Sequence, residues 1–254
     1  MDNIWTPERI ENYKNASEYT FFHRKLSVLA EPYLDENQTM ADIGCGPALI
    51  DFWLAPMVSE LTAIDSDPAA IDYLNTYLDA IFITNRGVAD KIIPRLAGVD
   101  DLRDESWDIV LLSFFGLNEE YLEKLLPLAR RRILIFMHGR PDTTGPIALA
   151  SLDDGGKFAA PEMEAYLEKK GLAYRKKTME MQFGQPFKSI EDIHAFLSSC
   201  GDSAYYGDSA GFEKSMADAE ERIVKTGRFD YPYYLPKSIS VAMFVISATR
   251  EESV

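Results

Sequence analysis

Residues 39–49, TMADIGCGPAL, are the stretch that most constrains the fold of this chain. Apart from Asp42, the residues before the first glycine are small or apolar, which predicts a short buried strand that ends in a glycine turn. Gly44 and Gly46 allow the backbone to turn tightly and leave no side chain between the chain and a ligand. We expect the free N–H groups of this turn to form a cradle for hydrogen-bond acceptors, followed by a helix.

A second predicted strand, residues 61–65 (LTAID), ends on the carboxylate of Asp65. The acid follows the turn by about 20 residues, the spacing at which it can reach both hydroxyls of a ribose bound over the turn. A dinucleotide-binding turn has a third glycine three positions after the second, where it admits a pyrophosphate. This position is Leu49, so the pattern disfavours a nicotinamide-dependent oxidoreductase.

The segments ADIGCGPAL and LTAIDSDPAAI together resemble the first two strand motifs of the class I S-adenosylmethionine-dependent methyltransferases, and the resemblance extends over residues 38–138. It implies an α/β fold with a doubly wound, mostly parallel, seven-stranded Rossmann-like sheet. It also implies S-adenosyl-L-methionine as cofactor, S-adenosyl-L-homocysteine as product, and methyl transfer by SN2 displacement. In such a reaction, alignment of the nucleophile, the methyl group and the sulfur supplies much of the rate.

Further strands are predicted at residues 91–96, 109–113 and 133–137, because apolar runs alternate with helical patterns as they do in a parallel sheet. Residues 174–183 and 240–248 are expected to add an antiparallel edge. The arginine run 130–132 is interpreted as the end of the preceding helix, where cations are favourable, rather than as a phosphate site.

Three parts of the chain are expected. Residues 1–37 form an N-terminal helical cap, residues 38–183 with 238–254 form the Rossmann-like domain, and residues 184–237 form a helical insertion before the last strand. Most connections are about 4–6 residues long, and much longer ones tend to be lids or binding segments, so the insertion is interpreted as a lid over the acceptor site. The aromatic cap either packs on the sheet edge or covers the cofactor site.

The resemblance places the cofactor at the carboxyl ends of the strands. An acid that usually contacts the adenine after the third strand falls on Gly98 here, so Val99 and Asp100 are the expected substitutes. The aromatic pair after the fourth strand either walls the methionine half of the cofactor or packs in the core. The expected cofactor-binding residues are Asp42, Gly44, Cys45, Gly46, Asp65, Ser66, Val99, Asp100, Ser113, Phe114 and Tyr19.

His138, at the end of the fifth strand, is the best placed of the three histidines to act as a catalytic base for a protonated acceptor. It is otherwise a hydrogen-bonded loop histidine. Tyrosines offer apolar contact with a hydroxyl group and suit a pocket wall for an organic acceptor. Tyr205 and Tyr206 in the insertion either form this wall or seal a homodimer interface. The expected substrate-binding residues are Tyr13, His23, Phe115, Tyr205 and Tyr206.

The composition of the chain limits the classes of molecule that it is expected to bind. A formal net charge of −15 would repel most of a nucleic-acid backbone, so a small-molecule acceptor is expected. The two cysteines have no metal-binding spacing, and the apolar runs are shorter than the ~20 residues of a membrane span. Together with an N-terminus unlike a signal peptide, these features predict a cytoplasmic enzyme without a metal. A non-catalytic S-adenosylmethionine-binding sensor or scaffold is the main alternative.

Overall fold

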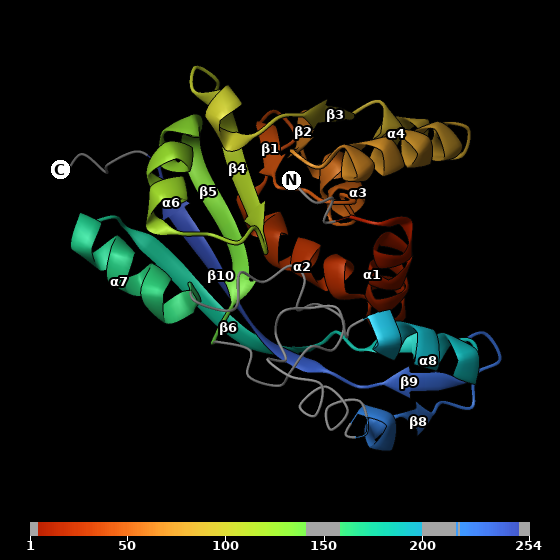
Figure 1. Ribbon diagram of the computed structural model, residues 1–254. Helices are drawn as coiled ribbons and strands as arrows, with labels where there is room; N and C mark the ends of the chain where they lie inside the picture. Colours follow the sequence, from red (N-terminus) through yellow and green to blue (C-terminus); the bar gives the residue numbers. More distant parts are fainter. Residues whose placement is uncertain (1–4, 141–157, 200–216, 218, 249–254) are drawn as a thin grey trace.

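The computed structural model describes residues 5–140, 158–199, 217 and 219–248. Seven strands form one sheet in the order β3-β2-β1-β4-β5-β10-β6 (Figure 1). Five neighbouring strands of the sheet are parallel to one another, namely β3, β2, β1, β4 and β5. Strand β10 is antiparallel to both of its neighbours. The first strand therefore lies in the centre of the sheet, and the predicted doubly wound, mostly parallel, seven-stranded fold is confirmed.

All seven predicted strands are present, each near its expected place. Strands β1, β2 and β4 are buried along almost their whole length, as expected for strands covered on both faces. The strands of the sheet are β1 (Thr39–Ile43), β2 (Glu60–Asp65), β3 (Ile92–Leu96), β4 (Trp107–Ser113), β5 (Ala129–His138), β6 (Tyr174–Gln182) and β10 (Ser238–Ser247).

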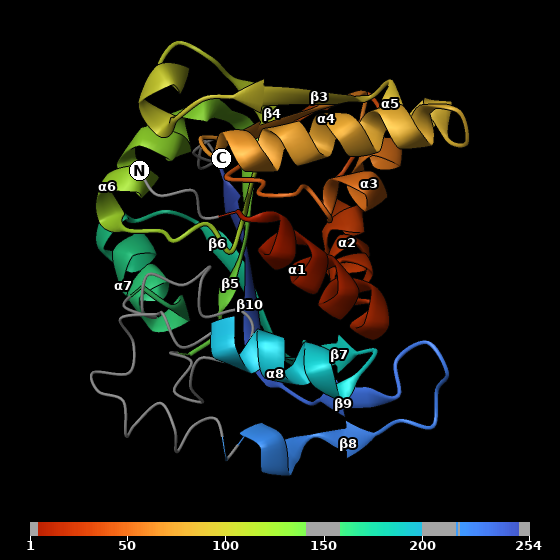
Figure 2. The same ribbon diagram turned by 45° about the vertical axis from the view of Figure 1, so that its right-hand side comes forward.

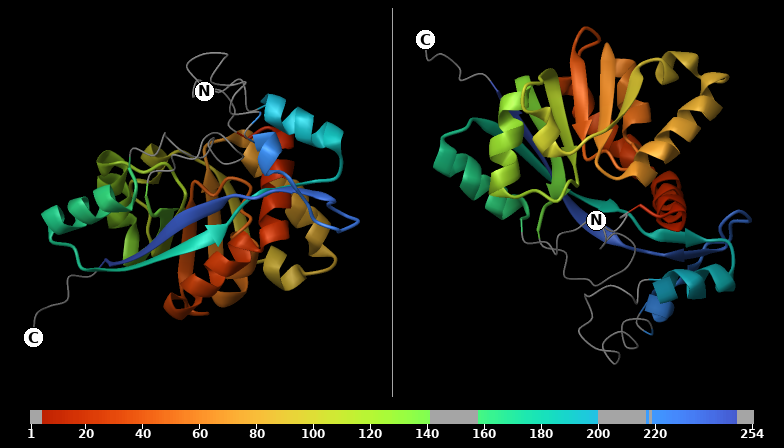
Figure 3. Two further views of the ribbon diagram at one scale, coloured as in Figure 1. Left: turned by 90° about the horizontal axis from the view of Figure 1, so that it is seen from below. Right: turned by 45° about the horizontal axis from the view of Figure 1, so that its top comes forward.

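Helices cover both faces of the sheet, in two layers that are visible on either side of it in Figure 1 and in the right view of Figure 3. Leu26 and Leu74 pack in the core of one face, and Leu122 and Leu167 pack in the core of the other. The first face carries α1 (Pro7–Thr20), α2 (Phe22–Ala30), α3 (Asp51–Leu54), α4 (Pro68–Phe82) and α5 (Arg86–Ala89); the second carries α6 (Glu119–Leu125) and α7 (Ala160–Lys170). Short 3-10 turns are η1 (Glu31–Tyr33), η2 (Ala55–Met57), η3 (Val99–Leu102) and η4 (Leu126–Leu128).

Side-chain caps explain where several helices begin. Thr6 accepts a hydrogen bond from the N–H of Arg9 at the start of α1, and Asn118 does the same for Tyr121 in α6. Asp67 caps α4 by accepting from the N–H of Ala69 at 2.9 Å. Each cap satisfies an N–H group that has no partner within the helix.

The interpretation of residues 130–132 as a helix end is wrong. Helix α6 ends at Leu125 and is followed by η4, which contains Pro127. Because proline has no N–H and its ring clashes with the preceding turn of an α-helix, the chain leaves the helix here and enters β5 at Ala129. The three arginines therefore lie at the beginning of a strand.

The insertion, residues 184–237, contains more β structure than its sequence indicates. Helix α8 (Ile190–Ser199) is present, and three short strands pair in the order β7-β9-β8. Figure 2 shows this unit beside α1. The hydroxyl of Tyr231 donates to Asn15 Oδ1 at 2.9 Å, and the rings of Tyr19 and Tyr234 stack at 4.7 Å, so the insertion is joined to the N-terminal cap. Its strands are β7 (Gln185–Phe187), β8 (Val224–Lys225) and β9 (Tyr233–Leu235).

Candidate functional site

The glycine turn after β1 is held by the end of β2. Gly44 and Gly46 have φ angles of +74° and +54°, as a tight glycine turn requires. The N–H groups of Gly44 and Cys45 both donate to the carbonyl of Ile64, and the N–H of Gly46 donates to Asp65 Oδ2 at 2.7 Å. The prediction of a cradle of free N–H groups is therefore wrong at these three positions, because the end of β2 lies close enough to take all three donors.

Asp65 is fixed where β2 meets this turn. Its second oxygen, Oδ1, accepts from the N–H of Asp67 at 2.8 Å. Burial raises the pKa of the Asp65 carboxyl, and the hydrogen bonds from the N–H groups of Asp67 and Gly46 oppose this shift. A carboxylate has about four acceptor positions, and these two bonds leave capacity for hydroxyl donors.

Asp42 and Asp51 form a buried carboxyl pair near the turn. Asp42 lies in β1 and Asp51 begins α3, and both are fully buried. Apart from each other, neither has a hydrogen-bond partner among the described residues. Burial raises the pKa of Asp42 to about 7 and that of Asp51 well above its usual value, and the contact between them lowers the former and raises the latter. Two buried carboxyls in contact therefore favour sharing one proton over carrying two charges.

Cys45 lies within reach of all three carboxyls. Burial raises the pKa of its thiol well above the usual value, and the charges of Asp51, Asp42 and Asp65 add to this effect. The thiol is protonated at neutral pH and donates to the carbonyl of Gly46 at 3.4 Å. The turn thus has three nearby carboxyls and no free N–H from Gly44 to Gly46, an arrangement that favours a cationic, hydroxyl-bearing ligand over a phosphate.

Two aromatic rings cover the glycines. A Cβ atom on Gly44 would collide with the ring of Phe115, and one on Gly46 would lie 2.6 Å from Cζ2 of Trp5. The backbone N–H of Trp5 donates to Asp67 Oδ2 at 2.8 Å and so connects the start of the cap to the end of β2. A ligand that lies on the two glycines must displace these rings.

His138 is the last residue of β5 and so lies at the carboxyl ends of the parallel strands, as the glycine turn does. It is beside the residues that follow β4. Its ring meets that of Phe114 edge-on at 5.3 Å, and Phe114 in turn contacts Phe22 of α2 at 5.8 Å. Phe114 has a φ of +52°, a strained conformation for a residue with a side chain, and Ser113 ends β4 directly before it. The structure therefore brings together three of the predicted residues: Ser113, Phe114 and His138.

Tyr13 and His23 belong to a buried polar chain in the cap. The Tyr13 hydroxyl lies 2.9 Å from His23 Nε2, and the Ser17 hydroxyl lies 2.6 Å from Nδ1. Burial lowers the pKa of His23 to about 3, so its ring is neutral. Burial and the charge of Asp42 raise the pKa of Tyr13, whose ring also contacts Trp5 at 5.3 Å. Tyr13 is thus next to the site, with His23 behind it.

The other predicted residues that the structure describes have different surroundings. Ser66 is exposed, and Val99 packs on the core of the second sheet face at the start of η3. Asp100 is 65% exposed and pairs with Lys124 at 3.0 Å. Tyr19 contacts the rings of Tyr231 and Tyr234 of the insertion. Tyr205 and Tyr206 lie outside the described residues.

No protein-family model matches the sequence, and no curated protein is detectably similar to it. Solved structures are similar in fold. The YcgJ protein from Bacillus subtilis aligns over 89% of this chain and 98% of its own, with a TM-score of 0.56 at 14% identity. Magnesium protoporphyrin IX methyltransferase from Synechocystis, solved with bound S-adenosylhomocysteine, aligns over 93% of this chain and 85% of its own, with a TM-score of 0.52 at 11% identity.

The chain has the class I methyltransferase fold. This fold does not determine the reaction, because the [4+2]-cyclase SpnF is also similar, with a TM-score of 0.53 at 13% identity over 88% of this chain and 80% of its own. Within the described ranges, no helix is long and apolar enough to cross a membrane, and no cluster of side chains suits a metal ion.

Sequence reasoning missed three residues of this methyltransferase-fold site. Trp5 gave no signal beyond the aromatic character of the cap. Asp51 directly follows the apolar pair Leu49-Ile50. An acid next to such a pair, at the buried start of a helix, is the signal that identifies Asp51 as a site residue. Ala48 has a φ of +56° although it has a Cβ atom, and nothing in an alanine predicts this conformation.

Proposed function

We propose that this chain binds S-adenosyl-L-methionine at the glycine turn and transfers its methyl group to a small-molecule acceptor. The observation that carries the proposal is the charge of the turn, where Asp42, Asp51 and Asp65 converge and the N–H groups of Gly44–Gly46 are already used. S-adenosyl-L-methionine has an ammonium, a sulfonium and two ribose hydroxyls but no phosphate. A nicotinamide dinucleotide would instead place a pyrophosphate against carboxyls.

The residues present fit this ligand. Asp65 would accept from the ribose hydroxyls, and the Asp42–Asp51 pair, which has no other described partner, would face the ammonium group. Phe115 and Trp5 would move from the glycines and wall the ligand. The bound cofactor supplies a methyl group activated by positive sulfur. The chain's own contribution is to align the acceptor, and His138 would remove a proton from an acceptor that carries one.

Calorimetric titration with S-adenosyl-L-methionine, S-adenosyl-L-homocysteine and NAD tests the binding. Each charge-assisted hydrogen bond is worth about 1.5–3 kcal/mol, so Asp65→Ala should weaken binding of the first two ligands by tens-fold or more. Asp65→Asn, which keeps an oxygen for the N–H of Gly46, controls for damage to the turn. Asp72→Ala, at an exposed position of α4, is the matched control and should bind as wild type.

Unchanged affinity in Asp65→Ala, with the fold intact by circular dichroism, would contradict the assignment of the ribose contact. Binding of NAD in place of S-adenosyl-L-methionine would contradict the proposed function as a whole.

A second candidate is a non-catalytic sensor of S-adenosyl-L-methionine. The cover of Gly44 and Gly46 by Phe115 and Trp5 favours it, because ligand binding would then rearrange the start of the cap and the segment after β4. Turnover to S-adenosyl-L-homocysteine with cell extract as the source of acceptors separates the two functions. Tight binding with no turnover over a range of extracts would support the sensor.

A further inference from the structure

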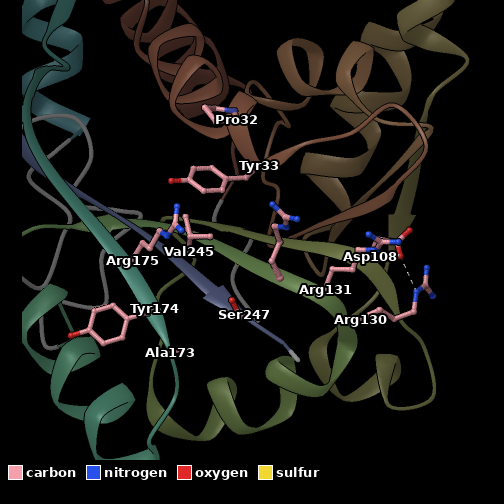
Figure 4. Close-up of a pocket in the computed structure, with 11 residues that line it drawn as sticks. Pro32, Tyr33, Asp108, Arg130, Arg131, Ala173, Tyr174, Arg175, Val245 and Ser247 are labelled. Atoms are coloured by element: carbon pink, nitrogen blue, oxygen red, sulfur yellow. Dashed lines mark hydrogen bonds and ion pairs between the residues drawn. The ribbon is translucent and has the colours of Figure 1, made fainter. Parts of the chain in front are cut away.

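A basic cleft lies at the amino ends of the parallel strands, whereas the glycine turn lies at their carboxyl ends. It is formed where β5 and β6 begin and β10 ends, and its volume is about 890 Å³ (Figure 4). Because the chain as a whole has a net charge of −15, this cleft differs in sign from most of the surface and would concentrate anions locally. The guanidinium groups that line it belong to Arg130, Arg131, Arg132 and Arg175.

Arg130 has a structural role. It donates to Asp108 Oδ1 at 3.2 Å, to the carbonyl of Ser106 at 2.8 Å and to Thr39 Oγ1 at 3.0 Å, and so connects the beginnings of β1, β4 and β5. Arg131 lies 3.6 Å from the same carboxylate. Asp108, whose pair with Arg130 is visible in Figure 4, is therefore occupied by these two arginines.

Arg132 and Arg175 differ from them. In the part of the chain that the structure describes, the side chain of neither forms an ion pair or a hydrogen bond. Asp35, which is fully exposed, is close enough for Arg131 and Arg132 to lower its pKa, although the hydrogen bonds from Asn37 contribute more. Among the described residues, no carboxylate contact therefore neutralises Arg132 or Arg175 within the cleft.

The strand register sets the spacing of these two arginines. Arg132 pairs with Ser247 of β10, and Arg175 pairs with Val245 two positions before it, so all four side chains belong to one face of the sheet. Their strands are separated by β10, which places them about 10 Å apart across the sheet. Figure 4 shows Arg175 beside Val245, with the ring of Tyr33 nearby. Two long cations thus flank a small floor with one hydroxyl and one apolar side chain.

We propose that this cleft is a binding site for a phosphorylated small molecule of the diphosphate class, with Arg132 and Arg175 as its phosphate ligands. Guanidinium groups bind phosphate oxygens in a bidentate manner, and two of them at this separation can engage adjacent phosphates from both sides. Val245 and the ring of Tyr33 provide apolar contact for the organic part. The site is separate from the glycine turn and does not depend on the function proposed there.

Inorganic pyrophosphate and uridine diphosphate are the probes, titrated calorimetrically at low salt into wild type, Arg132→Gln, Arg175→Gln and Arg86→Gln. The control, Arg86, lies in α5 with its side chain 73% exposed, and its change removes the same charge outside the cleft. We expect one saturable site per chain, weakened by about tenfold or more in each cleft variant and unchanged in the control. Affinity for S-adenosyl-L-homocysteine and the unfolding temperature should be the same in all four proteins.

Absence of saturable binding to both probes at millimolar concentration would overturn the proposal. An equal loss in Arg86→Gln would also overturn it, since the attraction would then be general and not that of a site. Binding of a single-stranded RNA oligonucleotide without binding of either probe would identify the cleft as part of a nucleic-acid surface instead.

Discussion

Asp51→Asn separates the stability of the glycine turn from its affinity for a ligand. Asp51 and Asp42 are fully buried, and each is the only described hydrogen-bond partner of the other. Asparagine has the shape of aspartic acid and no charge, and its amide can donate a hydrogen bond to Asp42 as a protonated carboxyl can. The change therefore keeps the packing and removes one titrating group.

The effect on stability depends on pH. Burial and the neighbouring Asp42 raise the pKa of Asp51 in the folded chain, so the native state holds a proton that the unfolded chain releases near pH 4. The stabilisation from this proton is complete below that pH and is lost as the pH rises toward the folded-state pKa. The loss is at most about 1.4 kcal/mol per pH unit, so wild type loses stability between pH 5 and pH 7 that Asp51→Asn keeps.

Urea unfolding of both proteins at pH 5, 6 and 7 measures this difference. We expect similar free energies of unfolding at pH 5, a clear advantage for Asp51→Asn at pH 7, and equal m-values. Asp72→Asn, at an exposed position of α4, should follow wild type at every pH. Parallel curves for Asp51→Asn and wild type would refute the buried, proton-sharing pair. Under the proposed function, the stabilised variant should also bind S-adenosyl-L-methionine more weakly, because asparagine cannot lose a proton to become a second carboxylate beside the ammonium.

Three further predictions follow from the cover of the turn and from the insertion. Gly46→Ala should lower the urea midpoint, because a left-handed residue with a side chain costs about 1–2 kcal/mol and its Cβ would press on Trp5; in a Trp5→Ala background the cost of Gly46→Ala should be smaller by the part due to the contact. If ligand binding displaces Trp5, titration with S-adenosyl-L-methionine should change the intrinsic fluorescence of wild type, and this change should be largely absent in Trp5→Phe at equal saturation. Replacing Tyr205 and Tyr206 together by alanine should leave cofactor affinity unchanged and reduce acceptor turnover; a shift from dimer to monomer on a sizing column with turnover preserved would identify an interface instead.

The sheet could be predicted from the sequence because its central strands are buried on both faces. The apolar runs at 109–113 and 133–137 mark the cores of β4 and β5 directly. The beginning of β5 could not be found in this way. Residues 130–132 continue the strand outside the core, where arginine side chains are compatible with a strand and with a helix end alike.

The small sheet of the insertion could not be predicted from the sequence for a different reason. Strands β7 and β9 have three residues each, too few to show an alternating pattern. They are far apart in the sequence, and Gln185 pairs with Leu235 and Phe187 with Tyr233. Because no short turn connects the two strands, no local turn motif predicts their pairing. Their stability comes from packing on α8 and α1, which is a tertiary effect.

Some features of the candidate site could be predicted from local sequence motifs, whereas others depend on tertiary packing. The glycines and Asp65 could be recognised because a tight turn and a strand-end carboxylate leave local patterns. The ligand preference of the turn depends on which donors and acids remain available, and β2 determines this by taking the N–H groups of Gly44, Cys45 and Gly46. The start of α3 then adds Asp51, an acid that belongs to no strand-end pattern. The same glycine turn with its N–H groups free and without this acid would favour a phosphate, so the distinction between the two ligand classes arises from tertiary contacts.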